Sequence, residues 1–248
     1  YIIFTRLTKN IVDAWTANSN AVANFYIEHL GINKKKISVI YNGVDREKFH
    51  ITIDRETKRR EFDITDDDFV IISVCRLASQ KGLDTLIKAA SLLESQPYLA
   101  SLNKKFIFLI VGEGPIEGRL KKMADDLKLK NIKFLGNRED VPELLKMSDL
   151  FVLPTLFEGM SNAIAEAMAA GLPVITTDIP ENRELIEDQK NGILIPPLNP
   201  LLLCNKIIHL YNDHGLRGLI GEDAKETILN RFDFKVTLMI YRNTYEKT

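Results

Sequence analysis

Short apolar, β-branched runs alternate along most of this chain with longer segments whose apolar residues recur at helical spacing. The helical pattern is clear in residues 81–95, where Leu83, Leu86 and Ile87 share one face. Strands that alternate with helices form a parallel sheet with helices on both faces, so we predict an α/β fold with a doubly wound parallel sheet. The predicted strands are 69–74, 106–111, 132–135, 150–153, 174–177 and 192–195, and the predicted helices are 81–95, 115–127, 140–147, 181–187, one from about 162, and those from 200 onwards.

The start of the chain carries a shorter version of this pattern, in which two strands flank a helix that Gly31 closes. These elements are the strands 13–17 and 37–40 and the helix 18–30, with Asn18 or Ser19 as its cap. Composition then becomes strongly charged over 54–68, which predicts a helical linker and a loop. Because the chain opens on Tyr1 and in mid-element, we expect a processed or excised piece.

One stretch combines a buried strand, a small-residue turn and an alanine-rich helix. Ligands of doubly wound sheets bind outside the carboxyl ends of the strands, and the first N–H groups of a helix there attract anions. Two carboxylates flank this site, with Glu158 on the turn and Glu166 about two helical turns later. The turn itself consists of Gly159, Met160, Ser161 and Asn162.

A structural interpretation of the two carboxylates competes with the functional one. A Glu in an alanine-rich helix is often solvated, or forms half of a capping box. The capping box fits poorly, because Asn162 would need its partner at Ala165. A carboxylate in a helix that is small and apolar all round is seldom left without a partner. The pattern therefore favours a binding role.

Two cations follow the first long strand. Arg76 leaves the end of the strand 69–74, and Lys81 opens the next helix, so both can converge on the crevice. Solvation at the surface is the alternative for either residue alone. Their positions, with Glu158 and Glu166 downstream, favour a place in the site.

Two loop segments carry weaker signals. Gly112, Gly114 and Pro115 follow a strand, but the third glycine of a dinucleotide fingerprint is missing and Pro115 has no N–H. We expect a tight turn with Pro115 at the first helical position, which at most lines the pocket. Asp140 and Glu143 have the spacing of a capping box, and we predict that Asp140 caps the following helix.

Composition excludes several other classes of function. The 33 basic and 34 acidic side chains leave no bulk charge that would favour nucleic acid or a membrane surface. No apolar run approaches the length of a spanning helix, and the pattern of a signal peptide is missing. Cys75 and Cys204 are expected to be reduced core thiols of a cytosolic protein. The four histidines have no metal-ligand spacing, so we predict no metal site.

The two carboxylates also carry a resemblance. Glu158-Gly159-Met160, followed by the segment from Glu166 to Val174, resembles the Glu-x7-Glu signature of retaining glycosyltransferases of the family-4, GT-B type. The resemblance implies a Rossmann-like donor-binding half and a remnant of the acceptor-side domain. It divides the chain into 1–45 (remnant and hinge), 46–230 (donor domain) and 231–248, a helix that crosses back through Phe232, Phe234, Leu238 and Tyr241.

The resemblance also implies roles for the site residues. Arg76 and Lys81 would hold the donor diphosphate and neutralise the leaving charge, a task that other folds give to a metal. Glu166 would accept hydrogen bonds from the ribose, and Glu158 would lie by the sugar ring, without being assigned as a nucleophile. The N–H groups of 160–162 would meet sugar and phosphate oxygens. Asn137 and Arg138 would lie against the base, although for Arg138 a solvated surface position is equally favoured, and the segment 182–185 would support the fold.

The implied function is transfer of a sugar from a nucleoside-diphosphate sugar to an unidentified acceptor sugar or glycolipid, with no cofactor. Such an enzyme would work in the cytoplasm, or peripherally at the inner face of the membrane through a missing N-terminal domain. A sugar-nucleotide epimerase on the same fold and a non-catalytic nucleotide-sugar-binding protein are the alternatives. The non-catalytic alternative is less favoured, because no pocket motif looks decayed.

Overall fold

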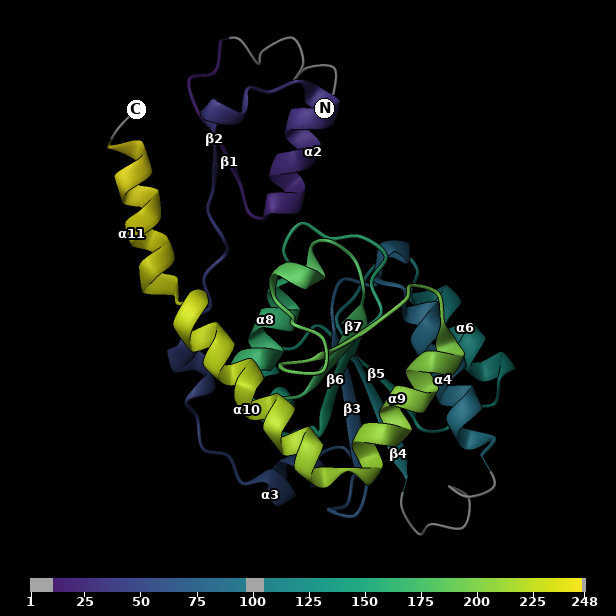
Figure 1. Ribbon diagram of the computed structural model, residues 1–248. Coiled ribbons are helices and arrows are strands. Elements are labelled where there is room, and N and C mark those ends of the chain that lie inside the picture. The colour runs from purple at the N-terminus through teal and green to yellow at the C-terminus, as the bar shows by residue number, and fades with distance from the viewer. Residues whose placement is uncertain (1–10, 97–104, 247–248) are drawn as a thin grey trace.

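The computed structural model describes residues 11–96 and 105–246 and contains two parallel sheets (Figure 1). The larger has six strands in the order β5-β4-β3-β6-β7-β8, and the smaller pairs β1 with β2. This confirms the predicted doubly wound α/β fold. The strands are β1 Trp15–Ala17, β2 Ile37–Val39, β3 Phe69–Val74, β4 Phe106–Val111, β5 Ile132–Gly136, β6 Leu150–Leu153, β7 Val174–Thr177 and β8 Ile193–Ile195.

Helices cover both faces of the six-stranded sheet, with α4, α6 and α9 on one face and α7, α8 and α10 on the other. The α-helices are α2 Asn20–Leu30, α3 Arg55–Arg60, α4 Leu83–Glu94, α6 Glu117–Asp126, α7 Val141–Met147, α8 Asn162–Ala169, α9 Pro200–Asn212, α10 His214–Arg231 and α11 Phe234–Tyr245. The 3-10 turns are η1 Lys34–Lys36, η2 Arg46–Phe49, η3 Ser79–Lys81 and η4 Asn182–Glu184.

The central strands are apolar throughout because both of their faces are buried. In β3, Val70 and Ile72 pack with the layer of α7, α8 and α10, whereas Phe69 and Ile71 pack with the layer of α4, α6 and α9. Strand order reverses between β3 and β6, which are neighbours in the sheet. Such a reversal opens a crevice outside the carboxyl ends of the two strands.

A small unit of β1, α2 and β2 lies beyond that end of the sheet (Figure 1). The Ser19 hydroxyl caps α2 by accepting the N–H of Val22, and Gly31 ends the helix with a left-handed φ of 67°. Both ends of the predicted helix are therefore confirmed.

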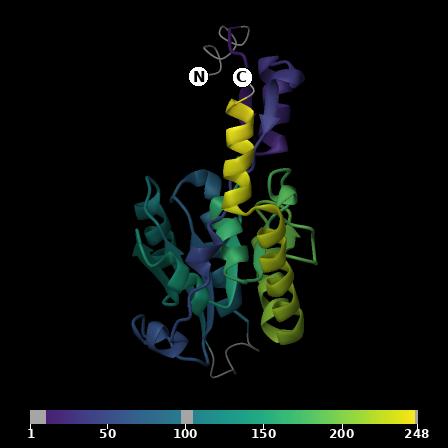
Figure 2. The same ribbon diagram turned by 90° about the vertical axis from the view of Figure 1, so that its left-hand side faces the viewer.

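The chain crosses between the two units twice, and the crossings lie side by side. Val44 donates its N–H to the carbonyl of Phe232 at 2.8 Å, and Phe234 returns a 3.1 Å bond to Val44. A Cβ on Gly43 would lie 2.4 Å from the Cα of Phe234, so only glycine fits there. After the second crossing, α11 runs beside the small unit in both ribbon views (Figures 1 and 2).

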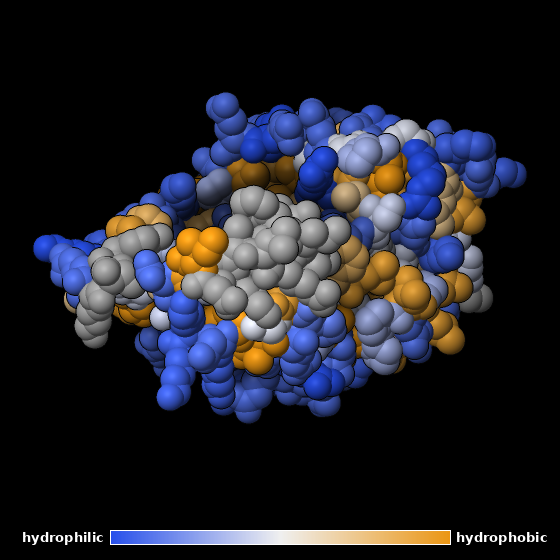
Figure 3. All heavy atoms as spheres, turned by 90° about the horizontal axis from the view of Figure 1, so that it is seen from above, coloured by the Kyte–Doolittle hydropathy of each residue, from blue (hydrophilic) through white to orange (hydrophobic). Residues whose placement is uncertain are grey.

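Helix α11 carries the exposed apolar residues Phe234 and Leu238, as predicted for a final helix not packed wholly on the main unit. Seen from the side of the molecule on which α11 and the small unit lie, the surface mixes apolar and hydrophilic side chains (Figure 3). Phe232 is a correction, because it is 1% exposed within the main core and meets the ring of Tyr41 edge-on at 5.3 Å. It therefore contributes to the hinge and not to the exposed face of α11.

Two other boundary predictions were wrong. Pro115 precedes α6, which begins at Glu117, because the N–H of Ile116 bonds across to the carbonyl of Leu77 at 3.2 Å. The predicted helix at 181–187 is only the short turn η4. There the buried Asn182 amide donates to Thr176 and Thr177 of β7, which holds the segment close to the sheet.

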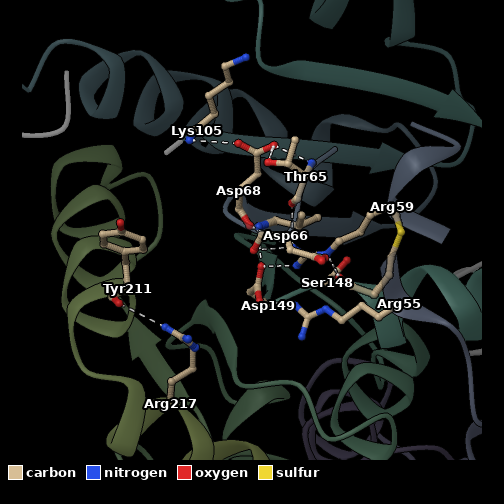
Figure 4. Close-up of polar contacts among 12 residues, drawn as sticks. Arg55, Arg59, Thr65, Asp66, Asp68, Lys105, Ser148, Asp149, Tyr211 and Arg217 are labelled. Carbon is tan, nitrogen blue, oxygen red and sulfur yellow. Dashed lines mark hydrogen bonds and ion pairs between the residues drawn. The ribbon is translucent and has the colours of Figure 1, made fainter. Parts of the chain in front are cut away.

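A closed polar network fastens α3 at the N-terminal ends of the strands (Figure 4). All three nitrogens of the buried Arg59 guanidinium donate hydrogen bonds, including one of 3.0 Å to the carbonyl of Met147 and one of 2.8 Å to Asp149. Asp149 also accepts the N–H of Val70 at 2.7 Å and pairs with Arg55. The linker is thereby tied to both β3 and the turn before β6.

Candidate functional site

The loops that follow β3 and β6 are joined at the switch point of the sheet. The carbonyl of Gln80 accepts the N–H of Leu156 at 2.7 Å and the hydroxyl of Thr155 at 2.9 Å. Gly82 has a φ of 65°, and a Cβ there would lie 1.9 Å from the carbonyl oxygen of Pro154. This close approach requires glycine, and it fixes the position of the residue between Gln80 and Gly82.

That residue is Lys81, and its ammonium lies 2.6 Å from the Glu158 carboxylate. The two side chains are only 15% and 7% exposed, so the ion pair is largely shielded from water. Lys81 ends η3, whereas α4 begins at Leu83, because the left-handed Gly82 breaks the helix between them. The prediction that Lys81 opens the helix was therefore wrong by one short turn.

Arg76 lies on the loop after β3 and is exposed. Within residues 11–96 and 105–246, its guanidinium has no hydrogen-bond or ion-pair partner. It borders a cavity of about 400 Å³ above the carboxyl ends of β3, β4 and β5. The cavity is lined by Val74, Cys75, Arg76, Val111, Gly112, Glu113, Asn137, Arg138 and Val141.

Glu113 is a lining residue that the sequence did not single out. Its carboxylate accepts a 3.2 Å hydrogen bond from the Asn137 side-chain amide and a longer one, of 3.4 Å, from the Asn137 N–H. The loops carrying the two residues are held together because Gly112 donates to Gly136 at 2.7 Å. A carboxylate between two glycines directly after a buried strand is the signal that could have identified it.

Arg138 also lines the cavity, but its guanidinium is bound to Asp140 through two hydrogen bonds of 2.8 Å. Lys58 reaches Asp140 as well, at 2.7 Å. Bonding to Arg138, followed by the contact with Lys58, holds the pKa of Asp140 well below its usual range. Asp140 makes no side-chain bond to the N–H groups of α7, so the predicted cap was wrong. Arg138 and Lys58 bind the Asp140 carboxylate in place of the first N–H groups of α7.

Glu166 stands on α8 and is half-buried. Burial raises the pKa of its carboxyl, and the charge of Lys48 partly offsets that rise. Among the residues that the structure describes, no donor is bonded to this carboxylate. A desolvated acceptor in that condition is suited to hydrogen-bonding hydroxyl groups of a ligand.

The turn before α8 contacts the small N-terminal unit. Asn42 donates its N–H to the sulfur of Met160 at 3.2 Å and its side-chain amide to Asn162 at 2.8 Å. A Cβ on Gly159 would come within 3.1 Å of the Asn18 amide.

The first N–H groups of α8 lack a side-chain cap. Ser161 occupies the cap position but makes no capping hydrogen bond. Within the described residues, the first turn of the helix therefore keeps N–H groups without a side-chain partner, as an anion site needs.

Cys75 shows how strongly this corner is desolvated. Burial raises the pKa of its thiol to about 12, against a smaller opposing effect of Lys81. The thiol is therefore protonated at neutral pH and does not act as a nucleophile there.

In the described part of the chain, no three His, Cys, Asp or Glu side chains are grouped closely enough to hold a metal ion. Nor does any helix described there have the length and apolar character needed to span a membrane.

The reversed strand order, with charged groups beside it, is the arrangement in which α/β proteins bind ligands outside the carboxyl ends of their strands. The family model for glycosyl transferases group 1 matches residues 54–227, and the model for Glycosyltransferase Family 4 matches residues 1–48. The chain belongs to the group 1 glycosyl transferases, and its fold is that of the GT-B glycosyltransferases.

Individual relatives agree with this assignment. The UDP-Gal:alpha-D-GlcNAc-diphosphoundecaprenol alpha-1,3-galactosyltransferase of Escherichia coli is 35% identical over 210 residues, 84% of this chain and 53% of the relative. The Anabaena Alr3699/HepE structure in complex with UDP and glucose has a TM-score of 0.89 and 26% identity over 99% of this chain and 66% of its own. A glycosyltransferase from Rickettsia africae has a TM-score of 0.87 and 27% identity over 98% and 66%. The chain spans about half the length of the curated relatives it matches.

Proposed function

We propose that this chain is the donor-binding half of a retaining glycosyltransferase that uses a uridine-diphosphate sugar. The observation that carries the proposal is the shielded Lys81–Glu158 pair at the switch point, next to a cavity that the unpaired Arg76 borders. Cations there suit a diphosphate, and carboxylates suit the hydroxyl groups of ribose and sugar. UDP is favoured because the Anabaena neighbour binds it and the E. coli relative uses UDP-Gal.

In the proposed reaction, the bond between the anomeric carbon and the diphosphate oxygen breaks, and its electron pair stays on the diphosphate. Arg76 and Lys81 stabilise that growing charge without a metal ion or other cofactor. Glu158 lies by the sugar ring, where its carboxylate steadies the positive charge of the anomeric carbon. The acceptor hydroxyl oxygen then bonds to the anomeric carbon on the face that the diphosphate leaves and passes its proton to the departing diphosphate oxygen, and bonding on that face retains the configuration.

The remaining donor contacts follow from the same geometry. Glu166 accepts the ribose hydroxyls, and the first N–H groups of α8, with the turn 159–162, meet sugar and phosphate oxygens. The uracil occupies the cavity against Asn137. Because Arg138 is held by Asp140, it contributes to the cavity wall and not a free charge.

The reaction also needs an acceptor, which a second domain would bind. We propose that residues 1–45 form the end of an acceptor-side domain, that 46–230 form the donor domain, and that 231–248 return to the first domain. The acceptor would be a sugar or a glycolipid, met in the cytoplasm or at the inner face of the membrane.

Calorimetric titration of this chain with UDP, with and without EDTA, tests the proposal. We expect binding that EDTA leaves unchanged. Incubation of the whole protein with UDP-sugars and a panel of sugar acceptors then separates transfer from epimerisation and from simple binding. Absence of UDP binding, or a strict need for Mg²⁺ or Mn²⁺, would contradict the proposal.

A further inference from the structure

One carboxylate of the main unit bonds the small N-terminal unit at four points. Glu184, at the end of η4, accepts the N–H of Ala21 at 2.9 Å on one oxygen. Its other oxygen accepts the Asn20 N–H and side-chain amide, each at 2.9 Å, and the Tyr41 hydroxyl at 2.8 Å. These partners come from two segments, the start of α2 and the hinge, more than 140 residues away in sequence.

The arrangement completes the N-terminus of α2. The first N–H groups of a helix have no partner within the helix and carry a partial positive charge. Here Ser19 accepts the N–H groups of Val22, through its hydroxyl, and of Ala23, through its carbonyl. Among the described residues, the N–H groups of Asn20 and Ala21 are bonded by Glu184 alone. The cap of this helix is therefore shared between two units of the protein.

Tyr41 extends the contact into the hinge. Burial raises the pKa of its hydroxyl to about 12, and the bond to Glu184 acts in the same direction. The hydroxyl therefore keeps its proton and donates it. The ring packs on Phe232, and the Tyr41 carbonyl accepts a 3.2 Å hydrogen bond from Thr237 of α11. Glu184 thus reaches both crossings of the hinge through one side chain.

The neighbours of these partners contact the turn that precedes α8. Asn42 follows Tyr41 and bonds Met160 and Asn162, while Asn18 lies against Gly159. Glu184 bonds the main chain of Asn20 and Ala21 and the side-chain hydroxyl of Tyr41, so it holds the two segments that place Asn18 and Asn42 over the turn.

We propose that Glu184 is a positioning residue that latches the N-terminal unit over the donor-binding turn 159–162. The proposal rests on the function proposed above, since that turn is where the donor would bind. Glu184 touches neither donor nor acceptor, and it acts through Asn20, Ala21 and Tyr41. Its loss should loosen the turn and slow transfer, while nucleotide binding to the main unit remains.

Amide hydrogen exchange measured by NMR on this chain tests the latch without any assay of activity. In Glu184→Gln we expect exchange of Asn20 and Ala21 to rise at least tenfold, with a parallel rise in 160–162 and none in β3. Tyr41→Phe keeps the ring and removes one of the four bonds to Glu184, together with the bond that the Asn20 side-chain amide donates to the Tyr41 hydroxyl, so it should give a smaller rise at the same amides. Glu187→Gln, which removes an exposed partner of Lys190, is the matched control and should change none of them.

Sugar transfer by the whole protein supplies the second measurement. We expect kcat to fall at least tenfold in Glu184→Gln, with a smaller rise in the Kd for UDP, because the turn 159–162 supplies only part of the proposed phosphate contacts. If exchange rises only in α2 and kcat is unchanged, Glu184 merely caps a helix and the latch is refuted. If UDP does not bind the unmodified chain, the proposed function fails, whereas the exchange of residues 160–162 still decides whether the latch exists.

Discussion

At the N-terminal ends of β3 and β6, Arg59 and Asp149 form a network in which every guanidinium nitrogen is bonded. At the carboxyl ends of the same strands, the described residues provide no partner for the Arg76 guanidinium or the Glu166 carboxylate. The two ends are built on the same sheet and by the same kinds of side chain. They differ in whether the charges are satisfied within the chain.

This difference separates a structural use of charge from a binding one. A buried charge is costly unless it is paired and hydrogen-bonded, so a paired group holds the fold and an unpaired desolvated group indicates a ligand. Lys81 and Glu158 stand between the two cases. They satisfy each other in the free protein, yet their position next to the cavity allows a bound diphosphate to compete for Lys81.

The largest effect is expected at the structural end. Arg59→Met removes the buried donor of Asp149, which keeps Val70 and Arg55, and leaves several carbonyls without a donor; removing one partner of a buried pair costs about 3–5 kcal/mol. Arg55→Met is the matched control, because Arg55 pairs with the same Asp149 from a side chain that is 45% exposed, and should cost at most about 1 kcal/mol. Urea unfolding measures both changes, and equal losses would show that burial does not set the cost.

A smaller effect is expected for the cations at the binding end. Arg76→Ala or Lys81→Ala should each weaken UDP binding by about 1.5–3 kcal/mol, the range for hydrogen bonds to charged groups. Arg76→Ala should leave the free energy of unfolding unchanged, whereas Lys81→Ala also strands Glu158 and should lower it. Arg119→Ala, at an exposed ion pair with Asp84 on α4, controls for a general loss of positive charge. A loss of affinity as large in Arg119→Ala would refute a specific diphosphate site.

The two glutamates should divide binding from transfer. Glu166→Gln should weaken UDP binding by about 1 kcal/mol, since it removes the charge of an acceptor for ribose. Glu158→Gln should leave UDP affinity within about 0.5 kcal/mol, because it touches no part of the nucleotide and frees Lys81. It should lower sugar transfer by the whole protein much further. If Glu158→Gln lost UDP binding and Glu166→Gln did not, the proposed order of the pocket would be reversed.

The elements of this fold follow from local patterns wherever burial dominates. Phe69–Val74 and Phe106–Val111 are predicted to the residue, because strands buried on both faces are apolar from end to end. Ser19 and Gly31 are likewise visible in the sequence, since a cap and a left-handed closing residue act within a few positions. The family resemblance was confirmed because its motif is also local.

The remaining features depend on partners that are distant in sequence. Asp140 has the spacing of a cap, but Lys58, more than 80 residues earlier, takes part in holding its carboxylate. The contact between Lys81 and Glu158 and the bonds of Glu184 to α2 likewise exist only after folding. The sequence placed Lys81 and Glu158 near the same crevice, but nothing in local spacing shows that they pair with each other or that Glu184 bonds α2.

The smallest predicted effect is the pH dependence caused by Glu166. Burial raises the pKa of this carboxyl above its unfolded value, so its contribution to stability is greatest below the unfolded pKa and is lost as pH rises through the folded pKa. Binding has the opposite sign, because ribose hydroxyls donate to the ionised form. Affinity for UDP should therefore fall as pH drops through that pKa. We expect the change between pH 7 and 5.5 to remain below tenfold, or about 1.4 kcal/mol.

The phosphate of UDP titrates between about pH 7 and 5.5, so the informative quantity is the ratio of affinities between the unmodified chain and Glu166→Gln at each pH. That ratio cancels the titration of the ligand and isolates the carboxyl. It should shrink towards one as the pH falls, since a protonated Glu and a Gln are both neutral. The free energy of unfolding, measured over the same range, should increase in Glu166→Gln relative to the unmodified chain as pH rises. A ratio independent of pH would mean that Glu166 does not meet the nucleotide, and the unpaired carboxylate would then belong with the structural charges at the other end of the sheet.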